Sequence, residues 1–199
     1  MKTRRQILLL TCLSFVVFLT AILVTTYRPK MTQAYARKNI PSETQKRNEK
    51  LLNQLGQAYA SMEKGDFDAA ETSLKKILQQ RPTYSMAMQL LGHVYYRSER
   101  YQKAEEVYRQ MIKNNEFDAS AYNNLGQALS RQGRHQEALK ELLHSEKLNP
   151  NNETVYINLS VVYAALDQPQ KARETFMAAH RLLLQKQQKN NASIPEKLP

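Results

Sequence analysis

The four histidines are the side chains best suited to bind a metal or transfer a proton, and they are His93, His135, His144 and His180. His135 and His144 lie nine residues apart, which puts them on different faces of a helix, and no H-E-x-x-H spacing occurs. Acidic pairs such as Glu105-Glu106 stand beside basic residues, as on a solvated helix face. The chain also lacks a G-x-S-x-G motif and a phosphate-binding glycine loop. The sequence therefore predicts no enzyme, no metal, no cofactor and no small-molecule substrate.

The single cysteine, Cys12, excludes both an intramolecular disulfide and a cysteine-rich metal site. The formal net charge of +11 is unevenly distributed: residues 1–30 carry +5, residues 31–48 carry +3 and residues 186–199 carry +2, which leaves +1 for residues 49–185. A duplex-binding protein needs its positive charge on the fold itself. We therefore expect no nucleic-acid partner.

The elements that would position any site begin with an apolar segment near the N-terminus. Residues 7–24 read ILLLTCLSFVVFLTAILV, without a charge, and residues 25–27 extend them. At about 1.5 Å per residue this stretch just spans a hydrocarbon core of about 30 Å. Basic residues flank both ends, as they do at membrane interfaces. The sequence predicts one N-terminal transmembrane helix over residues 7–27, which makes the membrane a partner of this chain.

The sequence leaves alternatives for the cleavage of the N-terminal segment and for its orientation in the membrane. Ala34-Tyr35-Ala36 has the form of a signal-peptidase site, so an exported form cleaved after Ala36 is an alternative to a signal anchor. The positive charges on the two sides of residues 7–27 are nearly balanced, but a short basic head tends to stay behind while a long domain crosses. We expect an N-in, C-out topology, with the C-terminal domain on the non-cytoplasmic side (periplasmic in a bacterium).

A pair formed by leucine and a small residue recurs along the chain, at spacings of 36, 34 and 34 positions. The pairs are Leu55-Gly56, Leu91-Gly92, Leu125-Gly126 and Leu159-Ser160. Large side chains stand three positions away on both sides, and an alanine with a large residue four positions later follows, as with Ala104 and Tyr108. These spacings are typical of amphipathic helices and occur twice per unit. The pattern predicts four helix pairs, with turns at Gly65, residues 98–100, Gly133 and residues 167–169. An ordinary antiparallel bundle would not require such a fixed register.

These units resemble tetratricopeptide repeats, whose pattern is W-x2-L-G-x2-Y, then A-x3-F and P. The third unit is the most similar, with Tyr122, Leu125-Gly126, Ala138, Leu142 and Pro150. The chain departs from the pattern in having no Trp, in Ser160 and in two extra residues between Gly56 and Gly65. The resemblance implies an all-α fold, a right-handed α-solenoid of four helix pairs.

The expected organisation has five parts: a basic head (1–6), the transmembrane helix (7–27), a basic linker (28–48), the solenoid (49–186, with units 49–84, 85–118, 119–152 and 153–186) and a polar tail (187–199). The resemblance also implies that the first helix of each unit lines a concave groove. The residues expected to bind a peptide or partner there are Asn53, Gln57, Gln89, His93, Arg97, Asn123, Asn124, Gln127, Arg131 and Asn158. Amides pair with the backbone of an extended peptide, although exposed amides also serve simply to keep a helix soluble.

Three functions follow as hypotheses. The first is a membrane-anchored adaptor or scaffold that binds an extended peptide or a partner helix in the groove. The second is a structural or assembly subunit of a membrane-associated complex, docking through its convex face. The third is a chaperone-like holdase for exported chains. The family's clamp for acidic C-terminal peptides is not reproduced, because only Arg97 and Arg131 bring positive charge to the middle of the groove.

Overall fold

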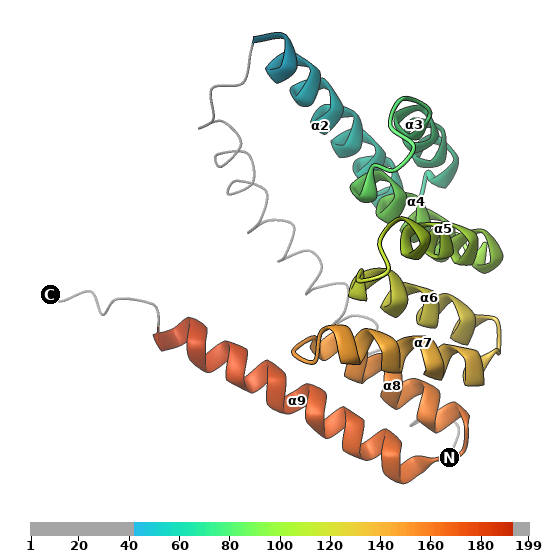
Figure 1. Cartoon of the computed structure of the whole chain (residues 1–199), viewed down its shortest axis with the longest axis vertical. Coiled ribbons are helices and arrows are strands. Elements are labelled where there is room, and N and C mark those ends of the chain that lie inside the picture. The colour runs from blue at the N-terminus through green and yellow to red at the C-terminus, as the bar shows by residue number, and fades with distance from the viewer. Residues whose placement is uncertain (1–41, 193–199) are drawn as a thin grey trace, which may run out of the picture. The chain divides into compact units, whose positions relative to one another are not determined.

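A computed structural model describes residues 42–192, and this part of the chain is entirely α-helical (Figure 1). Its helices are α2 (Ser42–Glu63), α3 (Phe67–Gln80), α4 (Ser85–Arg97), α5 (Tyr101–Asn114), α6 (Ala119–Arg131), α7 (His135–Leu148), α8 (Glu153–Ala165) and α9 (Pro169–Ala192). The chain divides into two units after Glu49, and the helical stack comprises residues 50–192.

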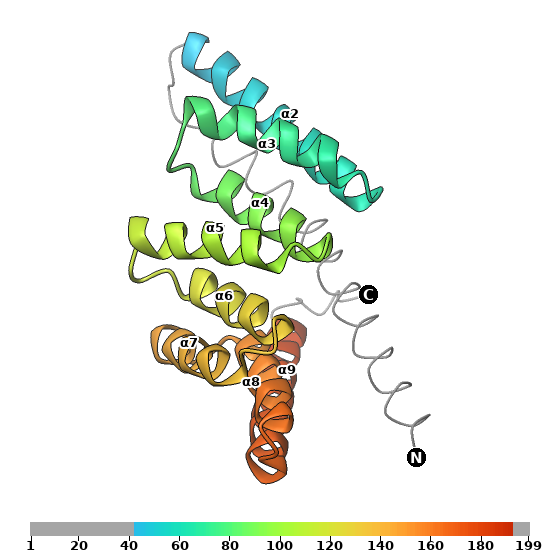
Figure 2. The ribbon, with the colours of Figure 1, turned by 90° about the vertical axis from the view of Figure 1, so that its right-hand side faces the viewer.

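Successive helices of the stack pack on one another from α3 to α9, and Figure 2 shows them following in chain order. Helix α6 also contacts α8, so the first helices of the last two pairs meet directly. Each first helix, α4, α6 or α8, is therefore held by the second helix of its own pair and by that of the preceding pair. This is the α-solenoid arrangement that the repeat predicts.

In every pair, the first helix is joined to the second by a turn that contains one residue with positive φ. The four residues are Gly65, Glu99, Gly133 and Asp167, at φ of 80°, 60°, 79° and 56°, and they recur at one constant interval in the sequence. The residue that follows donates its backbone N–H to the carbonyl oxygen five residues back, as Arg134 does to Leu129 at 3.0 Å. This Schellman-type bond ends the first helix of the pair. The predicted turns are confirmed.

Small residues let the two helices of a pair approach closely. A Cβ atom added to Gly92 would lie 2.4 Å from the ring of Tyr108, and one added to Gly126 would lie 2.6 Å from Cγ of Leu142. Both large side chains are fully buried there. The core of the stack is thus built on a repeated contact between a small residue of the first helix and a large residue of the second.

The first unit follows a different register from the one that Leu55-Gly56 suggests. One repeat length before Gly92 stands Ala58, which is fully buried, whereas Gly56 is only partly buried. The turn residues Gly65 and Glu99 keep the same interval. The two extra residues are therefore not an insertion in the helix pair: Ala58, not Gly56, takes the place of the small residue.

The described helices extend beyond two of the expected boundaries. Helix α2 begins at Ser42, inside the segment 28–48 expected as a linker, and α9 continues to Ala192, past 186. The predicted transmembrane helix 7–27 and the sites at Cys12 and Ala36 lie outside the described residues. Between residues 42 and 192 no helix combines the length and the apolar character that crossing a bilayer requires.

Candidate protein-interaction surface

The surface predicted to bind a partner lies on the first helices of the pairs. We define the A-helix face as the surface carrying Gln89, His93 and Arg97 of α4 and the equivalent residues of the next two repeats. Those equivalent residues are Asn123, Gln127 and Arg131 of α6, and Ile157, Val161 and Ala165 of α8. Asp118 and Asn152 begin α6 and α8 by accepting hydrogen bonds from the backbone N–H groups of Ala121 and Thr154. These caps fix where α6 and α8 begin, and therefore which of their residues lie on the A-helix face.

His93 and Asn123 of this face form one continuous hydrogen-bonded chain with the adjoining Asn124 and Asn158, across three helices, which we call the amide chain. Nδ2 of Asn158 donates to Oδ1 of Asn123 at 2.7 Å, and Nδ2 of Asn123 donates to Oδ1 of Asn124 at 3.3 Å. Nδ2 of Asn124 in turn lies 3.3 Å from Nε2 of His93. Asn123 and Asn124 are buried, so the chain stabilises groups that would otherwise lose their hydrogen bonds to water.

The three hydrogen bonds of the amide chain run in the same direction, which strengthens each of them. Since Asn124 donates to Nε2, His93 is a neutral imidazole with its proton on Nδ1. Burial lowers the pKa of His93, and the charge of Arg97 lowers it further, which favours that neutral form. Within the described hydrogen bonds, the chain therefore ends in a donor at His93 and an acceptor at Oδ1 of Asn158.

Two arginines stand where the face meets the turns. Arg131 donates to the hydroxyl of Tyr101 at 2.8 Å, and its guanidinium lies 5.3 Å from the centre of that ring. Arg97 lies 5.9 Å from the centre of the Phe67 ring and forms an ion pair with Glu63. Each arginine thus lies over the aromatic residue that begins the second helix of the preceding pair. Both remain exposed and keep a positive charge beside the amide chain.

The remaining expected residues fall into two groups. Gln89 and Gln127 are partly buried on the A-helix face. Asn53 and Gln57 are not buried, but the repeat register makes them equivalent to Ala87 and Leu91, which are buried against the preceding pair. They therefore lie at a different register position from the one expected, on the outer side of α2. The binding roles of all these residues stay predictions.

Sequence reasoning missed a second repeated link between neighbouring pairs. Arg100 bonds to Glu71 at 2.6 Å, and Arg134 bonds to Glu105 at 2.7 Å, with the same sequence separation of 29 positions in both. Partial burial alone would raise the pKa of Glu71, but hydrogen bonds from Lys75 and Tyr95 and the nearby positive charges lower it to about 2. The equal spacing of the two acid–base pairs is a signal that could have identified the link.

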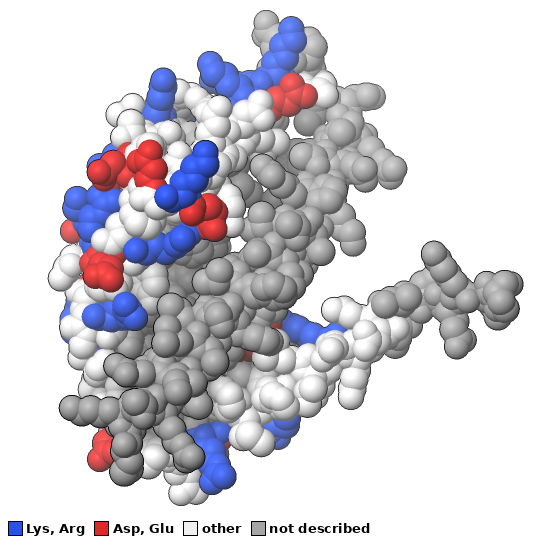
Figure 3. Space-filling view, turned by 180° about the vertical axis from the view of Figure 1, so that it is seen from behind, with Lys and Arg blue, Asp and Glu red and all other residues white. Residues whose placement is uncertain are grey.

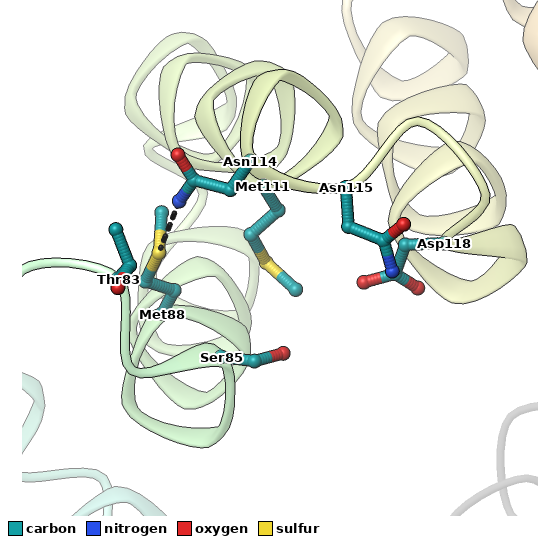
Figure 4. A pocket seen from close by; sticks show the side chains of 7 residues that line it. All are labelled: Thr83, Ser85, Met88, Met111, Asn114, Asn115 and Asp118. Carbon is teal, nitrogen blue, oxygen red and sulfur yellow. Dashed lines mark hydrogen bonds between the residues drawn. The ribbon is translucent and has the colours of Figure 1, made fainter.

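We call the second helices of the pairs, α3, α5 and α7, the outer helices. Acidic and basic side chains are interspersed on the face of the molecule that Figure 3 shows. A cavity of about 350 Å³ lies where α4 begins, α5 ends and α6 begins (Figure 4). It is lined by Thr83, Ser85, Met88, Met111, Asn114, Asn115 and Asp118, and Asn114 donates to the sulfur of Met88 at 3.5 Å. Within the described residues, no group of three His, Cys, Asp or Glu side chains could hold a metal ion.

Comparison with known proteins agrees with this architecture. Sequence profiles described as tetratricopeptide repeat match residues 55–115, 89–153 and 153–182. The chain is similar to the Type IV pilus assembly protein PilF of Pseudomonas aeruginosa, with 30% identity over 131 residues, which is 65% of this chain and 51% of PilF. This chain therefore spans only about half the length of that relative.

Solved structures show the same fold. MamA from Desulfovibrio magneticus RS-1, residue 41 to its end, aligns with a TM-score of 0.61 at 24% identity, covering 81% of this chain and 96% of that one. TTC0263, a thermophilic tetratricopeptide protein of Thermus thermophilus, aligns with a TM-score of 0.60 at 22% identity, covering 66% and 73%. At this identity the likeness establishes the arrangement of helices alone.

Proposed function

The chain belongs to the tetratricopeptide repeat family, and from that premise we propose that it is a non-enzymatic scaffold for protein–protein interaction whose A-helix face binds an extended peptide or a partner helix. The observation that carries the proposal is the amide chain with its arginine border. The buried asparagines hold three helices in fixed relation, so the face is organised before a partner arrives.

The chemistry of the A-helix face favours a partner that presents polar backbone groups and an acidic or amide side chain. The amide chain offers a donor at its α4 end and an acceptor at its α8 end, which suits the C=O and N–H groups of two separate peptide units of an extended segment. Arg97 and Arg131 add positive charge on the turn side, whereas Ile157 and Val161 make the α8 end apolar. A partner would thus place an apolar side chain against α8 and its polar groups along α4 and α6.

The apolar segment 7–27 extends the proposal to the membrane. An anchor there would confine the solenoid to the bilayer surface and raise the effective concentration of membrane-bound partners. We propose the N-in, C-out orientation for the anchored form, on the basis of the short basic head. Fusion of a reporter enzyme to the C-terminus, active only on one side of the membrane, would test the orientation.

Site-specific photocrosslinking tests the binding face. A photoreactive amino acid at Gln127, on the A-helix face, is expected to capture a discrete partner in native membranes. The same probe at Lys140, an exposed residue of α7, serves as control. Arg131→Glu should reduce the capture at Gln127, whereas Lys140→Glu, the same change of charge elsewhere, should not. Capture of one partner equally from both sites, unaffected by Arg131→Glu, would refute the proposal.

A second candidate function is an assembly subunit of a membrane-associated complex. It is favoured by the identity of 30% to PilF, whose name describes it as a pilus assembly protein. Such a subunit would dock through its outer helices, so the probe at Lys140 would capture its partner and the probe at Gln127 would not. The same experiment therefore separates the two functions.

A further inference from the structure

The last repeat exposes a large side chain at a position that the earlier repeats bury. Phe176 of α9 is 50% exposed, whereas its equivalents in the three earlier repeats, Leu74, Tyr108 and Leu142, are at most 1% exposed. Ala172 behaves in the same way: it is partly exposed, and the equivalent Ala138 is fully buried. The burial of these positions therefore depends on something that the last repeat lacks.

In the earlier repeats the first helix of the next pair supplies the cover. Helices α4, α6 and α8 pack on α3, α5 and α7, while in the described part of the chain no further helix packs on the outer side of α9. We define the C-terminal edge as Ala172, Arg173 and Phe176. Apolar side chains that are exposed at positions which the fold buries elsewhere indicate an interaction site.

The charge at the C-terminal edge is reversed relative to the first two repeats. Glu71 and Glu105 each receive an arginine of the next pair, Arg100 and Arg134. At the same register position the third repeat has the neutral Leu139 and the last repeat has Arg173. A carboxylate just after the last turn of a helix that covers α9 would therefore complement Arg173, as an arginine complements Glu71 and Glu105.

A second copy of this chain is poorly suited to supply that helix. Its α2 would offer Asp66 opposite Arg173, at the position equivalent to Arg100. However, the same helix would turn Asn53 and Gln57 towards Phe176, at positions where the covering helices carry apolar residues such as Leu125. Burying two amides against an aromatic ring without partners is unfavourable. The occupant must combine an apolar face with the acidic end.

We propose that the C-terminal edge binds an amphipathic helix of a partner protein. That helix lies where the first helix of another repeat would lie, packs small and aliphatic side chains against Phe176, and places a carboxylate against Arg173. This surface is distinct from the A-helix face, so the proposal stands independently of what that face binds.

A helical peptide copied from this chain provides a defined probe. Residues 119–134 contain a covering helix, because α6 packs on α5 and buries its own Ala121, Leu125 and Ala128. The probe is this segment with Arg134→Glu, hydrocarbon-stapled on its exposed face so that it is helical in solution, and labelled for fluorescence anisotropy. The matched control is the same peptide with the arginine kept.

With the full-length protein, the acidic peptide is expected to bind about fivefold more tightly than the arginine peptide. In the Arg173→Glu protein the order should reverse, because the arginine peptide then meets a carboxylate. Phe176→Ser should weaken both peptides by about tenfold. Phe117→Ser, which removes a phenylalanine 72% exposed on the loop between α5 and α6, should leave both affinities unchanged.

Any of the following results would overturn the proposal. Absence of binding by the helical peptide, equal binding to wild type and Phe176→Ser, or an unchanged preference in Arg173→Glu would exclude the partner helix. A dimer in wild-type protein that Phe176→Ser dissociates would assign the edge to a second copy. An intramolecular disulfide between Cys12 and the thiol introduced by Phe176→Cys would assign it to the chain's own segment 7–27.

Discussion

Glu99 has the left-handed backbone conformation that Gly133 has one repeat later, with φ of 60° against 79°. Both residues follow the first helix of a pair and allow the next residue to close its last turn. A side chain with a Cβ is strained in this region, by roughly 1–2 kcal/mol, because Cβ approaches the following carbonyl oxygen. Two of the four turns, at Glu99 and Asp167, therefore contain local strain that the glycine turns avoid.

Glu99→Gly is expected to stabilise the protein. Relief of the strain exceeds the extra backbone entropy that glycine loses on folding, so the free energy of unfolding should rise by about 0.5–1 kcal/mol. Urea denaturation of the full chain in detergent, followed by circular dichroism, measures the change. Gly133→Ala is the reciprocal control and should lower the stability. Destabilisation by Glu99→Gly would show that its side chain has a stabilising role that outweighs the strain.

Gly126→Ala is expected to destabilise the third pair. The added Cβ would lie 2.6 Å from Cγ of Leu142 and 3.2 Å from the backbone oxygen of Ala138, so α6 and α7 must separate. Overpacking of this kind costs roughly 1–3 kcal/mol. Ser160 of α8 occupies the equivalent position and already has a Cβ, so Ser160→Ala should change the stability far less. Thermal denaturation of the two variants side by side makes the comparison.

The lowered pKa of Glu71 predicts a loss of stability in acid. Because the folded protein holds this pKa at about 2, below its ordinary value of 4.5, the stabilisation is complete above pH 4.5 and declines as the pH falls towards 2. Glu71→Gln should lower the free energy of unfolding at pH 7 by roughly 1–3 kcal/mol. The difference in the free energy of unfolding between Glu71→Gln and the wild type should decrease below pH 4.5. Glu106→Gln, on the exposed side of α5, serves as the control.

The lowered pKa of His93 predicts a second pH dependence of stability, at a higher pH than that of Glu71. Burial and Arg97 keep its pKa below the ordinary value of 6.5, and the ring of Tyr108 lies 6.4 Å away. The unfolded chain therefore takes up this proton first, so stability is complete above pH 6.5 and falls as the pH decreases below it. The free energy of unfolding should therefore decrease between pH 7.5 and pH 5.5. The loss should be smaller in His93→Gln and unchanged in His180→Gln; an equal loss in all three would refute the assignment.

The helix pairs and their turns could be predicted because they depend on local pattern. Apolar spacing determined the type of each element, and the glycines at 65 and 133 marked turns that require positive φ. The first unit shows the limit of such matching. Leu55-Gly56 imitates the later pairs, but Ala58 is the residue that packs, because the register is set by the distance to the turn.

The candidate surface could be predicted only in outline. The sequence identified its asparagines, yet not that they bond to one another, since Asn158 meets Asn123 and Asn124 meets His93 only when helices from different repeats are aligned. Their burial also follows from that alignment and not from their type. In the same way, the exposure of Phe176 depends on the lack of a covering helix in the described stack, which its hydrophobic spacing does not reveal.

The identical interval between turn residues has a genetic consequence. Removing the segment 100–133, one repeat length, would join Glu99 directly to Arg134, and Arg134 would then lie where Arg100 now bonds to Glu71. Duplication of the same stretch would create an equally compatible junction. Recombination in register could therefore shorten or lengthen the stack by one whole unit in a single event, and the new pairing of α4 with α7 would again place a glycine of a first helix, Gly92, opposite a large residue of a second helix, Leu142.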